Sequence, residues 1–274
     1  MPQIKIASWN VNSVKARLEN LIFWLNHSKP DIVLLQELKC VEESFPFEAI
    51  SDLGYNVAVS GQKGYNGVAI LSKFKIEDVK KILPNPHHQD DNHARYIEAV
   101  IALPSTAIRV ASIYVPNGGA ELLPGQKINE SEKFIYKMKF FDRLHNHFNN
   151  LLKYNEIAVL GGDYNVAVND IDVYDPISLQ GTVCFHADEK KHFNAILNLG
   201  YADSFRAQNP STKAFSWWDY RGNGWAYDKG MRIDYLLTSP LASDKIISAF
   251  MEDKIVMDRD KPSDHCPVVC ILEI

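Results

Sequence analysis

The hydrophobic residues of the chain fall mostly in short runs, and this pattern predicts more β-strand than helix. Strands are predicted at 4–9, 31–37 and 155–165, each of which leads into polar residues, and the last two contain continuous apolar runs at 32–35 and 157–160. Runs of this length without alternation are typical of strands that are buried on both faces. Further strands are predicted at 55–60, 66–72, 96–103, 107–115, 214–220, 231–239, 247–257 and 266–274.

Three segments have the spacing of amphipathic helices, with apolar residues every three or four positions. The first follows Ser13, a residue type suited to the N-cap, and ends at Pro30. The longest covers 128–153, and a third at 187–198 ends just before a glycine. No Gly/Ser-rich or Pro-rich linker interrupts the chain. The sequence therefore predicts one α/β domain over 1–274, a four-layer sandwich of two packed mixed β-sheets flanked by helices.

The composition is that of an ordinary globular protein, with 46% hydrophobic and 23% charged residues. No run of about 18 apolar residues occurs, so no membrane span is expected, and no secretory signal is visible. The net charge of −5 argues against a protein held on nucleic acid by bulk charge, but it allows a site that binds substrate through a cation. Four scattered cysteines fit a reducing cytoplasm better than a disulfide framework: Cys40, Cys184, Cys266 and Cys270.

Polar residues at the ends of predicted strands are the best candidates for a site, because ligand sites in α/β sheets form where strands end. Each pair also has an ordinary explanation, since Asx residues terminate strands and cap helices. Asp234 is less ordinary, because a carboxylate between apolar neighbours must find a partner, and His265 is a suitable one. The pairs are Asn10 and Asn12, Gln36 and Glu37, Tyr114 and Asn117, Asp163 and Asn165, and Asp264 and His265.

The residue types in this set favour metal-assisted hydrolysis. Carboxylate and amide oxygens suit a hard cation such as Mg²⁺ or Mn²⁺, whereas zinc would prefer more histidine and cysteine at characteristic spacing. An Asp–His pair can orient or polarise a nucleophile. Neither a G-x-S-x-G elbow nor a P-loop is present. The most economical interpretation is hydrolysis of a phosphate ester.

Six short motifs in order, "WNVNS", "LLQELK", "YVPNG", "GGDYNVA", "RIDYLL" and "SDHCPV", resemble those of the exonuclease III family of AP endonucleases, within the endonuclease/exonuclease/phosphatase superfamily. The resemblance covers residues 4–272. It implies a DNase I-like fold and a Mg²⁺-dependent DNA repair phosphodiesterase, with Mn²⁺ as an alternative. Such an enzyme cuts double-stranded DNA 5′ of abasic sites and acts at 3′ ends as a phosphodiesterase or 3′→5′ exonuclease. A monomer is expected.

The resemblance also implies roles for individual residues. Asp163 would orient or deprotonate the attacking water, and Asn165 would stabilise the scissile phosphate in the transition state. His265 would contact a non-bridging phosphate oxygen, with Asp234 orienting it. Tyr114 and Asn117 would face the phosphate or the leaving oxygen. Glu37 would be the principal metal ligand, and the other residues expected at or near the metal are Asn10, Asn12, Asp163, Asn165 and Asp264.

A pocket with apolar walls would accept the bare sugar of an abasic nucleotide, which leaves the base stack at low cost. The resemblance assigns Trp217, Trp218, Met231 and Ile233 to this pocket, although "FSWW" could equally be strand core. Basic residues near the motifs are candidate phosphate contacts or simply solvated surface charges. These are Lys39, Arg95, Arg221 and Arg232.

Two departures from the family pattern leave the proposed chemistry intact: Leu38 replaces a common threonine, and Ser13 replaces a frequent glycine. The loop "AELLPGQK" offers little positive charge, which leaves open the balance between abasic-site cleavage and 3′-end processing. Two alternative functions are compatible with the same fold. One is a phosphatase that acts on inositol phosphates or sphingolipids, and the other is a non-catalytic binding module. His87, His88 and His93 lie in a polar segment where a loop is expected and a metal site is the alternative.

Overall fold

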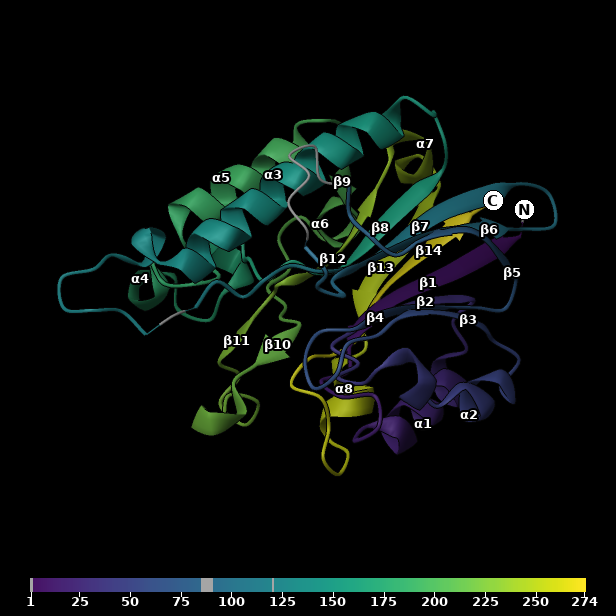
Figure 1. The fold of residues 1–274 in the computed structure, drawn as a ribbon, viewed down its shortest axis with the longest axis horizontal. Coiled ribbons are helices and arrows are strands. Elements are labelled where there is room, and N and C mark those ends of the chain that lie inside the picture. Colours follow the sequence, from purple (N-terminus) through teal and green to yellow (C-terminus); the bar gives the residue numbers. More distant parts are fainter. Residues whose placement is uncertain (1, 85–90, 120) are drawn as a thin grey trace.

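The computed structural model describes residues 2–84, 91–119 and 121–274, and within these residues two six-stranded β-sheets form the centre of the molecule (Figure 1). The first sheet has the order β13 (Ile246–Met251), β14 (Val268–Glu273), β1 (Gln3–Asn10), β2 (Ile32–Gln36), β4 (Val68–Ser72) and β3 (Asn56–Ser60). The second has the order β5 (Lys75–Lys80), β6 (Tyr96–Ala102), β7 (Ala107–Tyr114), β8 (Ala158–Asp163), β12 (Asp234–Thr238) and β9 (Ala202–Asp203). A separate ribbon joins β10 (Trp217–Trp218) and β11 (Gly230–Met231).

Helices cover the outer faces of both sheets (Figure 1). On one side, α3 and α5 lie next to each other and pack Phe141 and Phe193 with Leu160 of the second sheet. On the other side, Trp24 of α1 packs in one cluster with Trp9 of the first sheet. The predicted four-layer α/β sandwich is therefore confirmed. The helices are α1 (Leu18–Ser28), α2 (Phe47–Ser51), α3 (Glu132–Leu152), α4 (Pro176–Leu179), α5 (Ala187–Leu197), α6 (Ser204–Gln208), α7 (Pro240–Ser243) and α8 (Asp253–Met257).

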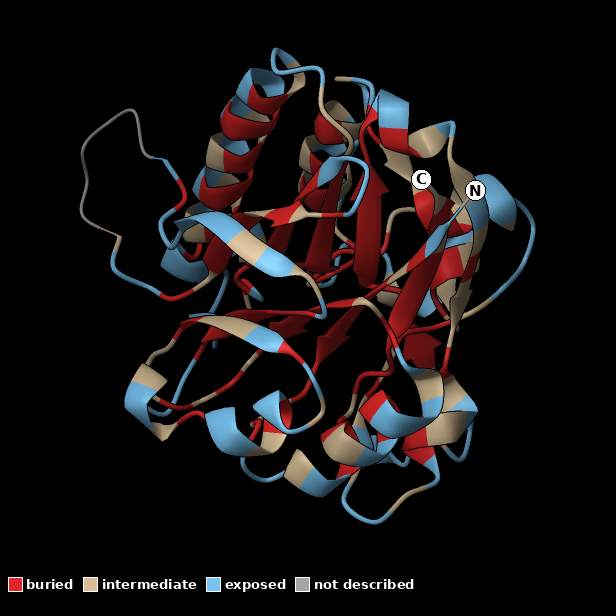
Figure 2. Ribbon diagram, turned by 90° about the vertical axis from the view of Figure 1, so that its right-hand side faces the viewer, coloured by how far each residue is buried: buried red, intermediate tan, exposed pale blue. Residues whose placement is uncertain are grey.

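The central core lies between the two sheets, where the strands are buried on both faces (Figure 2). In β1, Ile4 and Ile6 enter this inter-sheet cluster, whereas Trp9 packs in the cluster under α1. This arrangement explains why β2 and β4 appear in the sequence as nearly unbroken apolar runs. At Gly161 the sheets come close together, because an added Cβ would meet side-chain atoms of Leu236 and Leu34 at 2.5 and 2.7 Å.

Gln36 connects the two sheets through polar contacts rather than taking part in the site. Its amide nitrogen donates to Ser112 Oγ on β7 at 2.9 Å, and its amide oxygen accepts from Ser8 Oγ at 3.3 Å. The side chain is completely buried. Gln36 therefore has a structural role at the end of β2, where it holds the two sheets together.

Two predictions on local structure are wrong. Ser13 is not the N-cap of the first helix, because its Oγ accepts from the amide of Ala16 at 3.4 Å in the turn that precedes the helix. Its own amide and that of Val14 bind the carbonyls of Glu37 and Leu38 at 2.7 and 3.2 Å. This pairing with the loop after β2 delays the helix, which begins at Leu18. Ser13 has a φ of 93°, in the region that favours glycine.

The segment 247–257 is strand only as far as Met251, and it continues as the short helix α8. The change follows Glu252, whose carboxylate accepts hydrogen bonds from Trp24 Nε1 at 2.5 Å and from Ser28 Oγ at 2.7 Å. This anchor ends the strand, and the helix then places Met257 in the cluster under α1. Long-range contacts of this kind override local strand propensity.

No helix in the described part of the chain has the length and apolar character needed to cross a membrane. In the polar segment near position 90, His87 and His88 lie outside the described residues. His93 is exposed, and its Nδ1 lies 3.0 Å from the hydroxyl of Tyr136. Tyr136 also donates to Asp91 at 2.9 Å, so this part of the segment is tied to α3.

A buried ion cluster lies under α3, on the outer face of the second sheet. The carboxylate of Glu98 accepts from Arg109 Nη1 at 2.6 Å and from the Tyr96 hydroxyl at 2.5 Å, and it lies 2.7 Å from His147 Nε2. Burial alone would raise the pKa of Glu98, but these hydrogen bonds and the nearby positive charge lower it to about 2. The ionised carboxylate is therefore the form that the fold stabilises.

We expect Glu98→Gln to lower the free energy of unfolding at pH 7 by about 2–4 kcal/mol, because it removes the buried carboxylate that binds the guanidinium of Arg109. The folded pKa of Glu98 lies below its ordinary value of 4.5, so its stabilisation is present above that pH and is lost as the pH falls towards 2. Urea unfolding of both proteins at pH 7 and pH 3 measures the difference. An equal difference in the free energy of unfolding at both pH values would contradict the conclusion that the ionised carboxylate of Glu98 stabilises the fold.

Candidate active site

The candidate site lies at one edge of the two sheets, where polar residues from several strands converge. β1 and β2 run parallel, and so do β7 and β8, so their carboxyl ends point to the same edge. β12 and β14 run antiparallel to β8 and β1, so their beginnings lie there too. Asp234, the first residue of β12, is directly opposite Asp163, the last residue of β8. Strand order therefore gathers residues that are far apart in the sequence.

These residues surround an open cavity of about 460 Å³. One wall is polar and the other is apolar, so the cavity can hold a charged group beside an uncharged one. Its lining residues are Glu37, Tyr114, Asn117, Asp163, Asn165, Val183, Cys184, Trp217, Arg221, Met231, Ile233, Asp264 and His265.

Asn10 joins the two acidic residues at the base of the site. Its amide nitrogen donates to Glu37 Oε1 and to Asp163 Oδ2, each at 3.0 Å. The hydroxyl of Tyr114 also donates to Glu37 Oε1 at 2.8 Å, and Lys39 Nζ lies 2.9 Å from Glu37 Oε2. Burial would raise the pKa of Glu37, but the Asn10 hydrogen bond and the Lys39 charge lower it, so this group is a carboxylate. Burial beside Glu37 and Asp163 raises the pKa of Tyr114 well above its usual range, which leaves a neutral hydroxyl.

His265 lies between two buried carboxylates. Its Nδ1 is 2.9 Å from Asp234 Oδ2, and its Nε2 is 3.8 Å from Asp163 Oδ2. The hydroxyl of Ser216 donates to Asp234 Oδ2 at 2.6 Å, and Trp9 Nε1 donates to the carbonyl of His265 at 2.9 Å. These contacts fix the imidazole from both ends. The expected proximity of Asp234 and His265 is therefore confirmed.

The charges of His265, Asp234 and Asp163 affect one another. Burial alone would lower the pKa of His265, but Asp234 and Asp163 raise it, which favours the imidazolium. Burial raises the pKa of Asp163, and the nearby Asp234 and Glu37 carboxylates add to this effect against the opposing charge of His265. A carboxyl group with a raised pKa is a better proton acceptor than an ordinary aspartate.

Glu37 and Asp163 could hold a metal ion, since their ligand atoms and a ring nitrogen of His265 all lie within 4.8 Å of one another, and His265 as an imidazolium would border the ion rather than bind it. Carboxylates held this close repel each other unless a cation lies between them, and oxygen ligands suit a hard divalent cation. The residues present therefore fit such an ion. The amide of Asn10 and the buried side chain of Asn165 border the same space.

Asn12 and Asp264 lie at the edge of this group. Asn12 Nδ2 donates to Asp264 Oδ1 at 2.8 Å, and Trp217 Nε1 donates to Asp264 Oδ2 at 3.1 Å. The amide oxygen of Asn12 accepts from Lys39. Asp264 thus accepts hydrogen bonds from two side chains, and it links the polar side of the cavity to its apolar wall.

Asn117 and Asn165 form the opposite side of the polar wall. Asn117 Nδ2 donates to Asn165 Oδ1 at 3.0 Å, and the backbone amide of Asn165 donates to Asp163 Oδ1 at 2.9 Å. Asn165 has a φ of 50°, a conformation that asparagine tolerates better than most residues. Cys184, which the sequence did not single out, lies beside both amides, with Sγ 3.6 Å from Asn117 Nδ2. No local pattern in "GTVCF" could have indicated this position.

The apolar wall contains three of the four residues predicted for it: Trp217, Met231 and Ile233 line the cavity. Trp218 does not, and the structure corrects that prediction. Its side chain is only 2% exposed and packs edge-on against Trp225 in the cluster under α1. Adjacent strand residues point to opposite faces, so the two tryptophans could not both face the cavity.

The basic residues predicted near the site differ in their access to it. Arg221 lines the cavity, and its side chain is 89% exposed. Lys39 contacts Glu37, and the guanidinium of Arg95 stacks over the ring of Tyr114 at 4.7 Å. Arg232 is completely buried and binds two carboxylates, so the prediction that it contacts phosphate is wrong. Its partners are Asp172 and Asp203, each at 2.7 Å.

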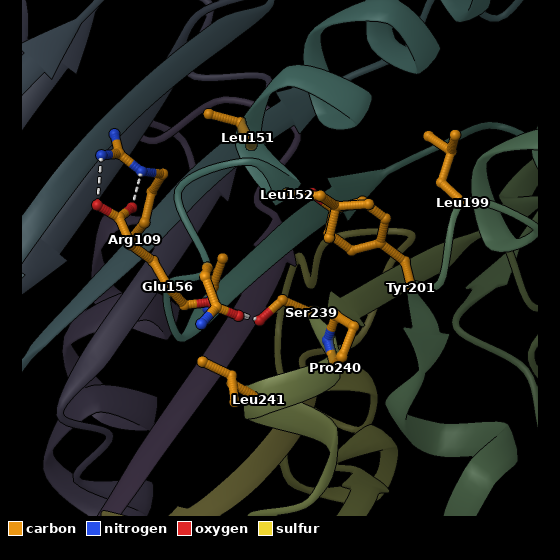
Figure 3. Close-up of a pocket in the computed structure, with 11 residues that line it drawn as sticks. Arg109, Leu151, Leu152, Glu156, Leu199, Tyr201, Ser239, Pro240 and Leu241 are labelled. Carbon is orange, nitrogen blue, oxygen red and sulfur yellow. Dashed lines mark hydrogen bonds and ion pairs between the residues drawn. The ribbon is translucent and has the colours of Figure 1, made fainter.

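A second cavity, of about 260 Å³, lies at the other end of the second sheet (Figure 3). Leu151, Leu152 and Leu241 are among its apolar lining residues. Arg109 and Glu156, the charged residues that line it, bind each other at 2.6 Å. The charged groups of this lining are therefore already paired, and of these two cavities the first has the clustered acids and imidazole of an active site.

Comparison with known proteins gives concordant matches along the chain. The Endonuclease/Exonuclease/phosphatase family matches residues 7–265. Exodeoxyribonuclease III of Haemophilus influenzae is 30% identical over 275 residues, which cover 97% of this chain and 98% of that protein. An AP endonuclease from Archaeoglobus fulgidus has 36% identity and a TM-score of 0.89, covering 99% of this chain and 100% of that one. A Neisseria 3′ phosphatase, NExo, bound to a product DNA hairpin has 33% identity, a TM-score of 0.89 and the same coverage.

Fold, cavity and relatives together define a hydrolase built on the DNase I-like fold. The chain belongs to the endonuclease/exonuclease/phosphatase family and, within it, to the group of exodeoxyribonuclease III and the AP endonucleases. The predicted enzyme class, a DNA repair nuclease of the exodeoxyribonuclease III type, is confirmed by this membership.

Proposed function

We propose that this enzyme hydrolyses the DNA backbone 5′ of abasic sites and also processes 3′ ends as a phosphodiesterase and 3′→5′ exonuclease. The observation that carries the proposal is the group formed by Glu37, Asp163 and His265, which faces a cavity that has an apolar wall. The H. influenzae relative is an exodeoxyribonuclease, the A. fulgidus relative an AP endonuclease and the Neisseria relative a 3′ phosphatase. All three activities break a phosphate ester bond, so one site can serve them.

Magnesium is the proposed cofactor, with Mn²⁺ as an alternative. Glu37 would be its principal ligand, because this carboxylate stays ionised and faces the cavity. Asp163 and Asn165 would complete the protein side of the site, with Asn10, Asn12 and Asp264 next to it. When bound, the ion neutralises charge on the phosphate and stabilises the charge that develops during hydrolysis. Mg²⁺ typically keeps few protein ligands, which fits this small set.

Asp163 is proposed to accept a proton from the attacking water. It is 1% exposed, and burial beside other carboxylates raises its pKa. The imidazolium of His265 and the amide of Asn165 would donate hydrogen bonds to phosphate oxygens, where negative charge increases in the transition state. Asp234 would keep His265 protonated and oriented. Tyr114 and Asn117 would supply further donors on the side of the leaving oxygen.

The apolar wall is proposed to select nucleotides without a base. A bare deoxyribose can contact the ring of Trp217 and the side chains of Met231 and Ile233, and it leaves the base stack at lower cost than an intact nucleotide. Arg221, Lys39 and Arg95 would bind phosphates on either side of the lesion. Because such contacts set position rather than sequence preference, cleavage should depend little on the neighbouring bases.

Double-stranded DNA with an abasic site or a 3′ end is the proposed partner. The DNA hairpin bound by the Neisseria relative supports this choice. We also propose a monomer that forms one domain, since both sheets share the inter-sheet core. A cytoplasmic location is proposed because the four cysteines are buried free thiols, a form that suits a reducing compartment.

The wild-type protein is expected to nick a duplex that contains one abasic analogue when Mg²⁺ is supplied, and EDTA should stop the reaction. Cleavage should return when excess Mg²⁺ is added, because the ion is an exchangeable part of the site. Denaturing gels of an end-labelled duplex measure both results. Folded, metal-loaded protein that leaves this duplex intact would contradict abasic-site cleavage, and unchanged cleavage in EDTA would contradict the metal.

A further inference from the structure

Behind the cavity, the ammonium group of Lys137 supports both asparagines that are proposed to face the phosphate. Lys137 lies on α3, and its side chain is fully buried. Its Nζ donates to the backbone carbonyl of Asn117 at 2.9 Å, to that of Asn165 at 2.6 Å and to the carboxylate of Glu189. An ammonium has three donors, so these three contacts use all of them.

Glu189 extends this contact to a third loop. It lies on α5, is fully buried, and accepts from the amide of Cys184 at 3.1 Å and from that of His186 at 2.9 Å. Cys184 in turn lines the cavity beside the two asparagines. One buried ion pair therefore joins three active-site loops to α3 and α5, which lie side by side over the second sheet (Figure 1).

The loops are held on both sides. At the cavity, the side chain of Asn117 donates to that of Asn165 at 3.0 Å, while the carbonyl of each residue is held from behind by Lys137. Gly118 follows with a φ of 84°, and a Cβ added there would lie 2.8 Å from Cδ of Lys137. The lysine stem therefore fits closely against the loop, and there is little room for Asn117 to shift.

We infer that the Lys137–Glu189 ion pair positions Asn117 and Asn165 for catalysis. A buried ion pair often gives no advantage in stability over well-packed apolar residues, so the three hydrogen bonds that this lysine makes to fixed loop atoms favour a positioning role. Three directional hydrogen bonds in a dry interior fix two carbonyls relative to each other, and the amide side chains on the same residues move with them. The inference rests on the proposed function, because it assigns these two residues to the transition state.

The test uses the double substitution Lys137→Met and Glu189→Gln, which removes both charges together and leaves no unpaired ion. Its kcat on an abasic duplex is expected to fall by about 10–100-fold, because small displacements of positioned groups have effects of this size. Its KM should change by less than about threefold, since phosphate contacts such as Arg221 are untouched. Glu98→Gln is the matched control: it also disrupts a buried ion cluster under α3, and it should lower stability without changing kcat.

A mutational cycle distinguishes positioning from general support of the fold. In a background that already carries Asn117→Ala and Asn165→Ala, the Lys137 and Glu189 substitutions should lower kcat by less than about threefold, because their targets are gone. A purely structural role would instead give the same further loss in both backgrounds. Each kcat is normalised to the folded fraction, measured by circular dichroism at the assay temperature.

A folded double variant with kcat within twofold of wild type would overturn the inference, as would a loss that only follows the folded fraction. If the double variant does not fold, Glu189→Gln alone is used, because it keeps the size of the side chain and one acceptor oxygen for one of the two backbone amides, which bind different oxygens of Glu189. Its kcat should fall by about 3–10-fold, and an unchanged kcat would again overturn the inference. Wild-type protein is assayed in parallel to separate a failure of the positioning role from a failure of the proposed function. If the wild-type protein does not cut the duplex, the proposed function is contradicted.

Discussion

Replacing Asp163 with asparagine is expected to reduce kcat by about 10²–10⁴-fold while leaving the fold intact. The substitution removes the one group at the end of β8 whose raised pKa suits it to take a proton from water. The introduced amide has the same shape, and its oxygen can still accept from the amide of Asn165, as Asp163 Oδ1 does at 2.9 Å, while only the hydrogen bond from Asn10 to Oδ2 is lost. Packing should therefore change little. Single-turnover cleavage of an abasic duplex measures the effect.

A measurement of DNA binding distinguishes a loss of proton transfer in the Asp163→Asn variant from damage to the DNA-binding site. Loss of a negative charge beside a polyanion should leave the affinity of the Asp163→Asn variant unchanged or slightly higher, as measured by fluorescence anisotropy in Mg²⁺. Asp142→Asn is a suitable control, because it removes an equal charge from an exposed position on α3. A variant at position 163 with nearly wild-type kcat would assign proton transfer to another group.

Replacing Asp234 with asparagine is expected to lower kcat at neutral pH by about 10²-fold. Asp234 lies 2.9 Å from His265 and raises the pKa of its imidazole against the opposing effect of burial. Without that charge the pKa of His265 falls, so the imidazole loses its proton at a lower pH. The alkaline limb of the kcat profile should therefore move to lower pH, and acidification should restore part of the activity.

The shift in the pH profile is the decisive observation, because a merely destabilised protein would lose activity without moving the limb. Asp203→Asn provides a matched control: it removes a carboxylate that binds the buried Arg232, away from His265. This control should lower the melting temperature and keep the wild-type pH profile. An unshifted limb in the Asp234→Asn variant would show that His265 does not depend on Asp234 for its protonation.

Much of the site could be predicted from the sequence because strand ends carry its residues. Asn10, Tyr114 and Asp163 each end a strand. Parallel pairing of β7 and β8 brings Tyr114 and Asp163 to one edge, and the packing of the two sheets brings Asn10 of β1 there, where it donates to Asp163. Asp234 was also recognisable, since a carboxylate among apolar neighbours requires a partner. Such inferences succeed because alternation of side chains and the direction of strands leave few arrangements.

The parts that sequence could not give depend on contacts between distant segments. Lys137 looks like any lysine on a helix, and only the fold places Asn117, Asn165 and Glu189 around it. Arg232 was misassigned for the same reason, because its carboxylate partners are distant in sequence. Charged residues are ambiguous in a single sequence until burial is known.

The most direct test of the whole account is a side-by-side cleavage assay with wild-type protein in Mg²⁺. The substrates are a duplex with one abasic site, an undamaged duplex with a recessed 3′ end, and a duplex that ends in a 3′-phosphate. We expect cleavage 5′ of the abasic site and release of the 3′ group, both abolished by EDTA and by Asp163→Asn. Release of phosphate from an inositol phosphate or a sphingolipid, with no cleavage of any DNA substrate, would contradict the account.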